Sequence, residues 1–132
     1  MKYMLAVLLS LCLLYSCDPL RRINIKNRSG EDADIIWTLL KDSAKTSLLF
    51  ISNDEEVKFH LKTKRPNNEA NMSFGIGSWT NEMLKSLADD LESLEINSAK
   101  DSIHLKTTAD IWKYLSDRKK GLGKSKIQIT LN

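Results

Sequence analysis

Two histidines are the first residues to consider for catalysis or metal binding, since imidazole serves both roles near neutral pH. His60 follows Phe59, His104 follows Ile103, and each histidine is followed by a leucine. Alternation along a strand would bury these apolar neighbours and turn each histidine to solvent. Two outward histidines could share a metal across adjacent strands, but no clustered carboxylates complete a ligand set. We therefore expect no metal site.

Carboxylates occur in two groups, Asp54-Glu55-Glu56 and Asp89-Asp90. A glycosidase needs two carboxylates that flank one bond, but the first group belongs to a turn and the second to the solvated face of a helix. A Ca²⁺ site at the first group would lack the regularly spaced loop that makes such sites specific. The chain also has no nucleophile elbow, zinc-protease motif or phosphate-binding glycine loop. The sequence predicts no catalytic residue, no cofactor and no enzymatic activity.

Tryptophans are the next candidates, because aromatic faces stack on sugars and peptides. Trp37 falls in an apolar strand pattern, Trp79 precedes a helix, and Trp112 lies on or beside a helix's apolar stripe. A core position explains all three, whereas Trp112 and Trp37 are the candidate ligand contacts.

A basic run near the carboxyl end is the candidate for contact with a membrane or another anion. It consists of Arg118, Lys119, Lys120, Lys124 and Lys126. Lys58, Lys62 and Lys106 also fall on outward strand positions with Lys126, which suggests one broadly basic sheet face for lipid headgroups or an acidic glycan. Lysines that protect solvated sheet edges are the alternative interpretation.

Hydrophobic periodicity predicts the elements that carry these residues. Alternating or continuous apolar patterns predict strands over 22–26, 34–40, 47–51, 57–61, 72–77, 94–96, 102–106 and 126–131, with 34–40 as the central strand. The segment 64–71 is the longest polar loop.

Thr80 and Thr107 are expected to cap two amphipathic helices, the second of which ends in the cations of 118–120. About eight short strands and two helices predict an α+β, β-rich fold, an antiparallel sandwich-like sheet with both helices packed on it.

The amino terminus has the three regions of a secretory signal: Lys2, an apolar run of about 12 residues, and the small residue Ser16. The run is too short for a transmembrane helix, which needs about 20 apolar residues, and Asp18-Pro19 ends it. We expect residues 1–16 to be removed, 17–20 to form a short tether, and 21–132 to form one domain.

The end of this signal, Leu14-Tyr15-Ser16-Cys17, resembles the lipobox of bacterial lipoproteins, although Tyr15 stands where a smaller residue is usual. The resemblance covers residues 1–18 and implies cleavage before Cys17, thioether lipidation of its sulfur and acylation of the new terminus. Ordinary signal cleavage would instead leave Cys17 as a thiol with no intrachain cysteine to pair with, in an oxidising compartment.

Composition and tether resemble those of small lipoproteins of the Bacteroidota, which also glycosylate Asp-Ser/Thr motifs of the kind found at Asp42-Ser43-Ala44 and Asp101-Ser102-Ile103. Ser43 and Ser102 are therefore candidate O-glycosylation sites.

Charge excludes a dedicated nucleic-acid binder. Without Lys2, the count of Lys plus Arg falls from 20 to 19 against 17 Asp plus Glu, a net charge of +2.

Together these features predict a lipid-anchored protein of the bacterial cell envelope, of the inner or the outer membrane, with an anchor that faces the periplasm and a non-catalytic binding or structural role. A glycan or another envelope protein is a candidate partner. Two alternatives are an accessory glycan-binding lipoprotein of a surface uptake system, which needs Trp112 or Trp37 exposed beside a groove, and a periplasmic enzyme or inhibitor, which needs titratable groups that converge in a pocket.

Overall fold

Two four-stranded sheets and two α-helices make up the protein in a computed structural model, which describes residues 18–40, 55–100 and 102–132. The elements are β1 (Leu20–Asn27), β2 (Ala33–Leu39), β3 (Glu56–Leu61), β4 (Glu69–Ile76), α2 (Asn81–Asp89), β5 (Leu91–Ser98), β6 (Ser102–Leu105), α3 (Thr108–Ser116), β7 (Lys119–Lys120), the 3₁₀ turn η2 (Leu122–Lys124) and β8 (Lys126–Leu131). The expected α+β, β-rich class is confirmed.

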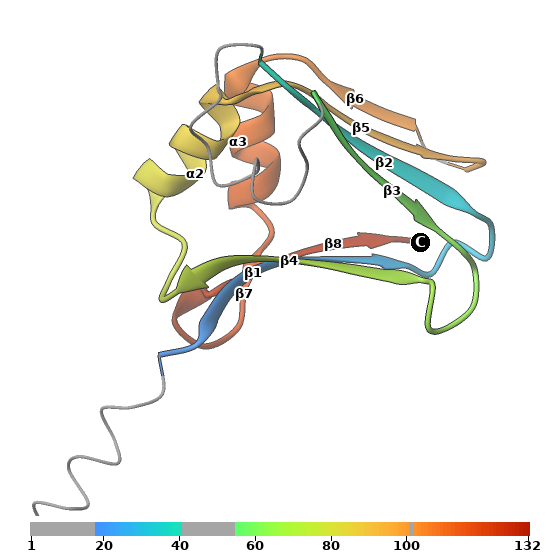
Figure 1. Cartoon of the computed structure of the whole chain (residues 1–132), viewed down its shortest axis with the longest axis horizontal. Coiled ribbons are helices and arrows are strands. Elements are labelled where there is room, and N and C mark those ends of the chain that lie inside the picture. The colour runs from blue at the N-terminus through green and yellow to red at the C-terminus, as the bar shows by residue number, and fades with distance from the viewer. Residues whose placement is uncertain (1–17, 41–54, 101) are drawn as a thin grey trace, which may run out of the picture.

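The two sheets form a wedge (Figure 1). Sheet A, with strand order β4-β1-β8-β7, lies at the bottom of the view, and sheet B, with order β3-β2-β5-β6, slants above it. The wedge is narrow where β1 leads to β2 and β3 leads to β4, and α2 and α3 lie at its wide end. Buried side chains from both sheets and both helices form one hydrophobic cluster, so a single core holds all of these elements together.

Sheet A is built on β1, whose isoleucines Ile23 and Ile25 are fully buried. It pairs antiparallel with β4 and parallel with β8, where Ile127 and Ile129 are also fully buried. The period of two then turns the even-numbered residues of both strands to the outer face of the sheet.

Sheet B has β2 at its centre, between β3 and β5, as the apolar pattern of 34–40 predicts. Ile35, Trp37 and Leu39 point into the core, whereas Asp34, Ile36 and Thr38 are only half-buried on the outer face.

The expected helix caps are confirmed. Thr80 Oγ1 accepts a hydrogen bond from Met83 N at 3.2 Å, and Thr107 Oγ1 accepts one from Asp110 N at 3.1 Å. These bonds satisfy backbone donors that have no partner inside the helix, which fixes where α2 and α3 begin.

Two boundaries differ from expectation. Helix α3 ends at Ser116, and the cations expected in its last turn become β7, because backbone pairing of Lys119 and Lys120 with β8 replaces further helical turns. Strand β4 begins at Glu69, inside the segment expected to be a polar loop, because its first residues pair with β1. The strand expected at 47–51 lies outside the described residues.

Candidate functional site

His60 lies at the edge of sheet B beside two aspartates. Its Nδ1 is 2.8 Å from Asp34 Oδ1 on the adjacent strand β2, and its Nε2 is 3.6 Å from Asp32 Oδ2. About half of the imidazole is exposed to solvent. The histidine therefore faces outward, as predicted, and is held by a neighbouring carboxylate.

His104 lies on β6, the opposite edge strand of the same sheet, with its Nε2 2.9 Å from Glu95 Oε1. Since β2 and β5 lie between β3 and β6, the two histidines are three strand spacings apart, or roughly 14 Å. That separation removes the shared metal site considered from the sequence. Within the described residues, no three His, Cys, Asp or Glu side chains are close enough together to hold a metal.

The acidic groups are dispersed in the same way. Asp89 pairs with Lys85 one helical turn away, with Nζ 2.7 Å from Oδ2, and Asp90 forms the C-cap of α2. Burial, and secondarily the charge of Asp89, raises the pKa of Asp90. Glu55 and Glu56 are exposed at the start of β3, on the other side of β2 from Asp90, and Asp54 lies outside the described residues. Of the described carboxylates, Glu92 and Glu95 line a common open pocket of about 480 Å³ beside β5 and β6, together with His104 and Lys106.

Two of the three tryptophans are core residues. Trp37 is fully buried, so this candidate ligand contact is inaccessible from the surface. Trp79 is 4 % exposed; its Nε1 donates to Arg22 O at 3.2 Å, and its ring packs edge-on against Phe74 at a centroid distance of 5.0 Å.

Trp112 remains a candidate contact residue, because it is half-buried beside a groove between α2 and α3. The groove has a volume of about 510 Å³ and is lined by Lys85, Asp89, Thr108, Ala109 and Trp112.

The basic run of 118–126 does not form one surface. Arg118 stacks on Tyr114, with its guanidinium carbon 3.5 Å from the ring centroid, and donates from Nη1 to Tyr114 O at 2.9 Å. Lys119 Nζ donates to Asn81 Oδ1 of α2 at 2.9 Å. These two cations are therefore engaged within the protein.

Lys120 and Lys126 instead lie opposite each other on the outer face of sheet A, and Lys126 also lies opposite Arg22. The result is a row of three cations across β1, β8 and β7. Adjacent strands are about 4.8 Å apart, and like charges directly opposite each other repel. Burial, followed by the charge of Arg22 and more weakly those of Lys26 and Lys120, lowers the pKa of Lys126, although Glu69 opposes this.

Sequence reasoning missed Arg22. Its alternation with Ile23 places it on an outer face, but only the parallel pairing of β1 with β8 brings it to Lys126, and strand pairing between residues about a hundred positions apart leaves no local signal. The expectation that Lys58, Lys62, Lys106 and Lys126 share one sheet face is wrong. Lys58 lies in β3, and Lys62 and Lys106 directly follow β3 and β6 of sheet B, whereas Lys126 lies in sheet A.

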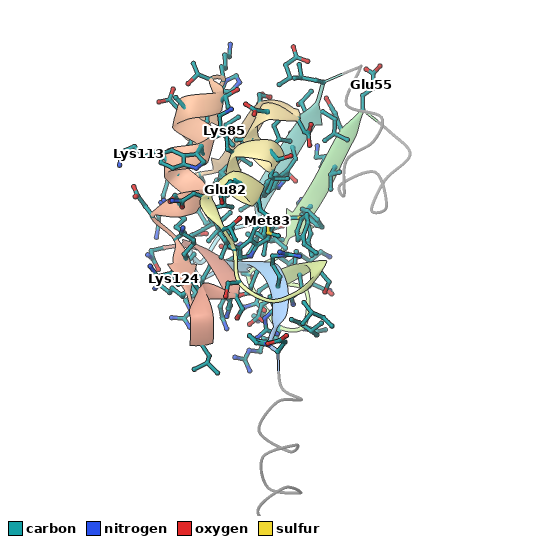
Figure 2. All side chains as sticks on the ribbon, turned by 90° about the vertical axis from the view of Figure 1, so that its left-hand side faces the viewer. Glu55, Glu82, Met83, Lys85, Lys113 and Lys124 are labelled. Carbon is teal, nitrogen blue, oxygen red and sulfur yellow. The ribbon has the colours of Figure 1, made fainter. Side chains whose placement is uncertain are left out.

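Exposed aliphatic side chains adjoin the cation row. Leu20 and Ile76 are partners in the β1–β4 register and are 59 % and 61 % exposed, and Leu122 in η2 is 82 % exposed. Gly77 N donates to Pro19 O at 2.9 Å, which fixes the start of the described chain beside Ile76. We call this part of the molecule the basal surface; it comprises Leu20, Arg22, Ile76, Lys120, Leu122 and Lys126. Lys124 lies next to it, at the left of the lower half of the molecule in Figure 2.

Of the three candidate modification sites, Ser102 lies within the described residues. Ser102 begins β6 and is exposed, and its Oγ donates to Asn97 Oδ1 at 3.1 Å. Cys17 and Ser43 lie outside the described residues.

The chain matches no protein-family model, curated protein or solved structure. Among the described helices, none has the length and apolar character needed to cross a bilayer.

Proposed function

We propose that this protein is a lipid-anchored component of a bacterial cell envelope, with a periplasm-facing domain that acts by binding or by structure without catalysis. The observation that carries the proposal is the lipobox-like sequence Leu14-Tyr15-Ser16-Cys17, which ends immediately before the first described residue, Asp18. Diacylglycerol and an amide-linked acyl chain would together supply enough buried CH₂ groups for stable membrane attachment, since one chain gives only reversible binding.

The tether supports this proposal because it is short. Pro19 is already hydrogen-bonded to Gly77 just after β4, so Cys17 is two positions in sequence from the first residue that is bonded to the domain. Two extended residues span at most about 7 Å. A lipid on Cys17 would therefore hold the domain at the headgroup layer.

Titratable side chains favour binding over catalysis. His104, Asp89 and Asp117 each pair with one neighbouring side chain of opposite type at the surface, and His60 lies between Asp34 and Asp32. A periplasmic enzyme needs such groups to be available to a substrate in one cleft. In the pocket lined by Glu92, Glu95, His104 and Lys106, the histidine is already paired with Glu95.

The test of the anchor is the intact mass of protein extracted from its native membrane, wild type beside Cys17→Ala. We expect the wild type to have the mass of residues 17–132 plus diacylglycerol and one acyl chain, and the variant to lack this addition. A wild-type chain of unmodified mass would refute the anchor. An additional mass on peptides that contain Ser43 or Ser102 would identify the proposed glycosylation.

An accessory glycan-binding role is the second candidate, and the half-buried Trp112 beside the α2–α3 groove favours it. Titration with soluble envelope glycans should then quench tryptophan fluorescence, and Trp112→Ala should abolish the quenching, whereas His60→Ala on sheet B should retain it. Quenching that is equal in Trp112→Ala and wild type would exclude this groove as the glycan site.

A further inference from the structure

The basal surface combines two features that a folded domain usually avoids on an exposed face. Leu20 and Ile76 place two large aliphatic side chains next to each other in water, and Leu122 adds a third at the adjoining turn. Single exposed aliphatic residues are common, but a contiguous group bordered by polar residues is typical of a contact surface.

Charge on this face is also unbalanced. All four strands of sheet A lie within the described residues, and Glu69 is the only acidic residue in them. Its Oε1 is already paired with Lys26 Nζ at 2.5 Å. Among the described residues, Arg22, Lys120 and Lys126 form no ion pair within 4.0 Å. The cation row is therefore available to an external anion, whose binding would relieve the repulsion within it.

The position of the basal surface, beside the start of the described chain, indicates which anion it binds. The bond between Gly77 and Pro19 holds Pro19 beside Ile76, so the point of lipid attachment proposed at Cys17 is two residues from the edge of the basal surface. Aliphatic residues at headgroup level and cations at the phosphates are the combination that binds peripheral proteins to anionic bilayers.

We propose that the basal surface docks on an anionic phospholipid bilayer, with Leu20, Ile76 and Leu122 among the headgroups and Arg22, Lys120 and Lys126 at the lipid phosphates. This inference rests on the lipid anchor proposed above and adds an orientation to it. Sheet B, on the far side of the wedge in Figure 1, then faces away from the membrane and presents His60 and His104 to the periplasm.

A site-specific dye tests the docking. In the lipidated mature chain, Cys12 has left with the signal and the sulfur of Cys17 is blocked, so Leu122→Cys provides a single thiol for an NBD label. The labelled full chain is reconstituted in vesicles of phosphatidylcholine, with or without phosphatidylglycerol. We expect blue-shifted, brighter NBD emission only with phosphatidylglycerol, and loss of this change at high salt. The same label at Ala99→Cys, in the exposed turn between β5 and β6, should not respond.

Charge-matched variants show whether the row is responsible. Arg22→Gln, Lys120→Gln and Lys126→Gln together should lower the docking equilibrium about 100-fold, from the contribution of each cation near an anionic surface. Lys58→Gln, Lys62→Gln and Lys106→Gln remove the same charge from sheet B and should leave docking within about twofold, because these lysines face away from the bilayer.

The outcomes separate the two proposals. A chain that takes up dye on two thiols is not lipidated, and this result overturns the anchor and the docking together. A singly labelled, vesicle-bound chain whose dye stays solvent-exposed on phosphatidylglycerol overturns docking alone. An equal loss of docking in the sheet A and sheet B triple variants would show a general effect of net charge and would also overturn the proposal. NBD emission that shifts equally on neutral vesicles would overturn recognition of the lipid phosphates and assign the surface to apolar insertion. Emission that follows the density of protein on the vesicle, and not the lipid charge, would assign the surface to a second copy of the chain.

Discussion

The outer faces of the two sheets treat charge in opposite ways. On sheet B, His60 and His104 each lie within 3 Å of a carboxylate on the neighbouring strand. On sheet A, the row of Arg22, Lys126 and Lys120 places cation opposite cation, with exposed aliphatic residues at one end. Sheet B therefore pairs its outward histidines with acceptors of its own, whereas sheet A leaves an unbalanced row at the end where the described chain begins.

This difference indicates which face depends on something outside the protein. Repulsion between directly opposed like charges costs stability, and selection for stability alone would tend to replace one member of the row. The paired face needs no partner to be stable, but the cation row gains from an anion. The following predictions test whether the two faces differ in this way, beginning with the residues that both sheets share as a core.

The largest effect should come from residues that point inward beside the cation row. Ile127 is fully buried and adjacent to Lys126 in β8. We expect Ile127→Ala to lower the free energy of unfolding by about 2–5 kcal/mol, because it removes buried methyl groups and leaves a cavity. Urea denaturation measures this loss. A cost below about 0.5 kcal/mol would mean that sheet A is not packed as described, and its outer face could not be inferred from alternation.

A smaller loss should follow from removing the polar link between the sheets. Asn27 at the end of β1 donates from Nδ2 to Glu31 O at 2.7 Å and to Leu61 O of β3 at 3.2 Å. Asn27→Ala leaves these buried carbonyl groups with fewer donors, so we expect a cost of about 1–3 kcal/mol in the same denaturation experiment. Asn24→Ala is the control, since its Nδ2 donates to Asn71 Oδ1 within sheet A alone. An equal or greater loss for Asn24→Ala would show that the inter-sheet link has no special role.

Local patterns predicted most of the fold and little of the basal surface. Period-two alternation located β2, β3 and β8, and threonines with suitable spacing located the starts of α2 and α3, because these signals involve neighbours in sequence. Non-local pairing decided the rest. The two-residue strand β7 exists only because β8 accepts it, and Arg22 joins Lys126 only because β1 and β8 are parallel neighbours.

Within the candidate site, the sequence identified Lys120 and Lys126 but grouped them with Arg118 and Lys119. The structure separates these cations. Arg118 stacks on Tyr114 and Lys119 donates to Asn81, whereas Lys120 and Lys126 lie on the outer face of sheet A. The exposed pair Leu20 and Ile76 could not be foreseen either, since an aliphatic residue in a strand is normally assigned to the core, and their exposure follows from their place at the end of sheet A.

Removal of one charge from the cation row should produce a small gain in stability. We expect Lys126→Gln to raise the free energy of unfolding by about 0.2–1 kcal/mol, the range for one unfavourable cross-strand pair. The pKa of Lys126, lowered by burial and then by the charge of Arg22, has the matching sign: the unfolded chain titrates near 10.5, so the wild type should gain stability as the pH rises toward 10.5 and this charge is lost.

Salt provides the control for this prediction. The gain in Lys126→Gln should shrink at high ionic strength, because screening weakens repulsion in the wild type. Lys58→Gln on sheet B should change stability by less than about 0.5 kcal/mol in either direction. A loss of stability in Lys126→Gln at low salt would contradict the unbalanced row.

The smallest effect concerns the ion pair that closes the far end of the same face. The hydrogen bond from Lys26 lowers the pKa of Glu69, and the more distant charges of Arg65 and Lys126 act in the same direction. This carboxylate therefore stabilises the fold above its unfolded value of 4.5, and the contribution is lost as the pH falls through the lowered folded value. In Lys26→Gln, an NMR titration of the side-chain carboxyl should place the pKa of Glu69 closer to 4.5. Lys120→Gln, at the opposite edge of the sheet, should leave the titration unchanged. If Lys120→Gln raised the pKa of Glu69 as much as Lys26→Gln does, the acid would be neutralising the whole face, and the cation row would not be available to a bilayer.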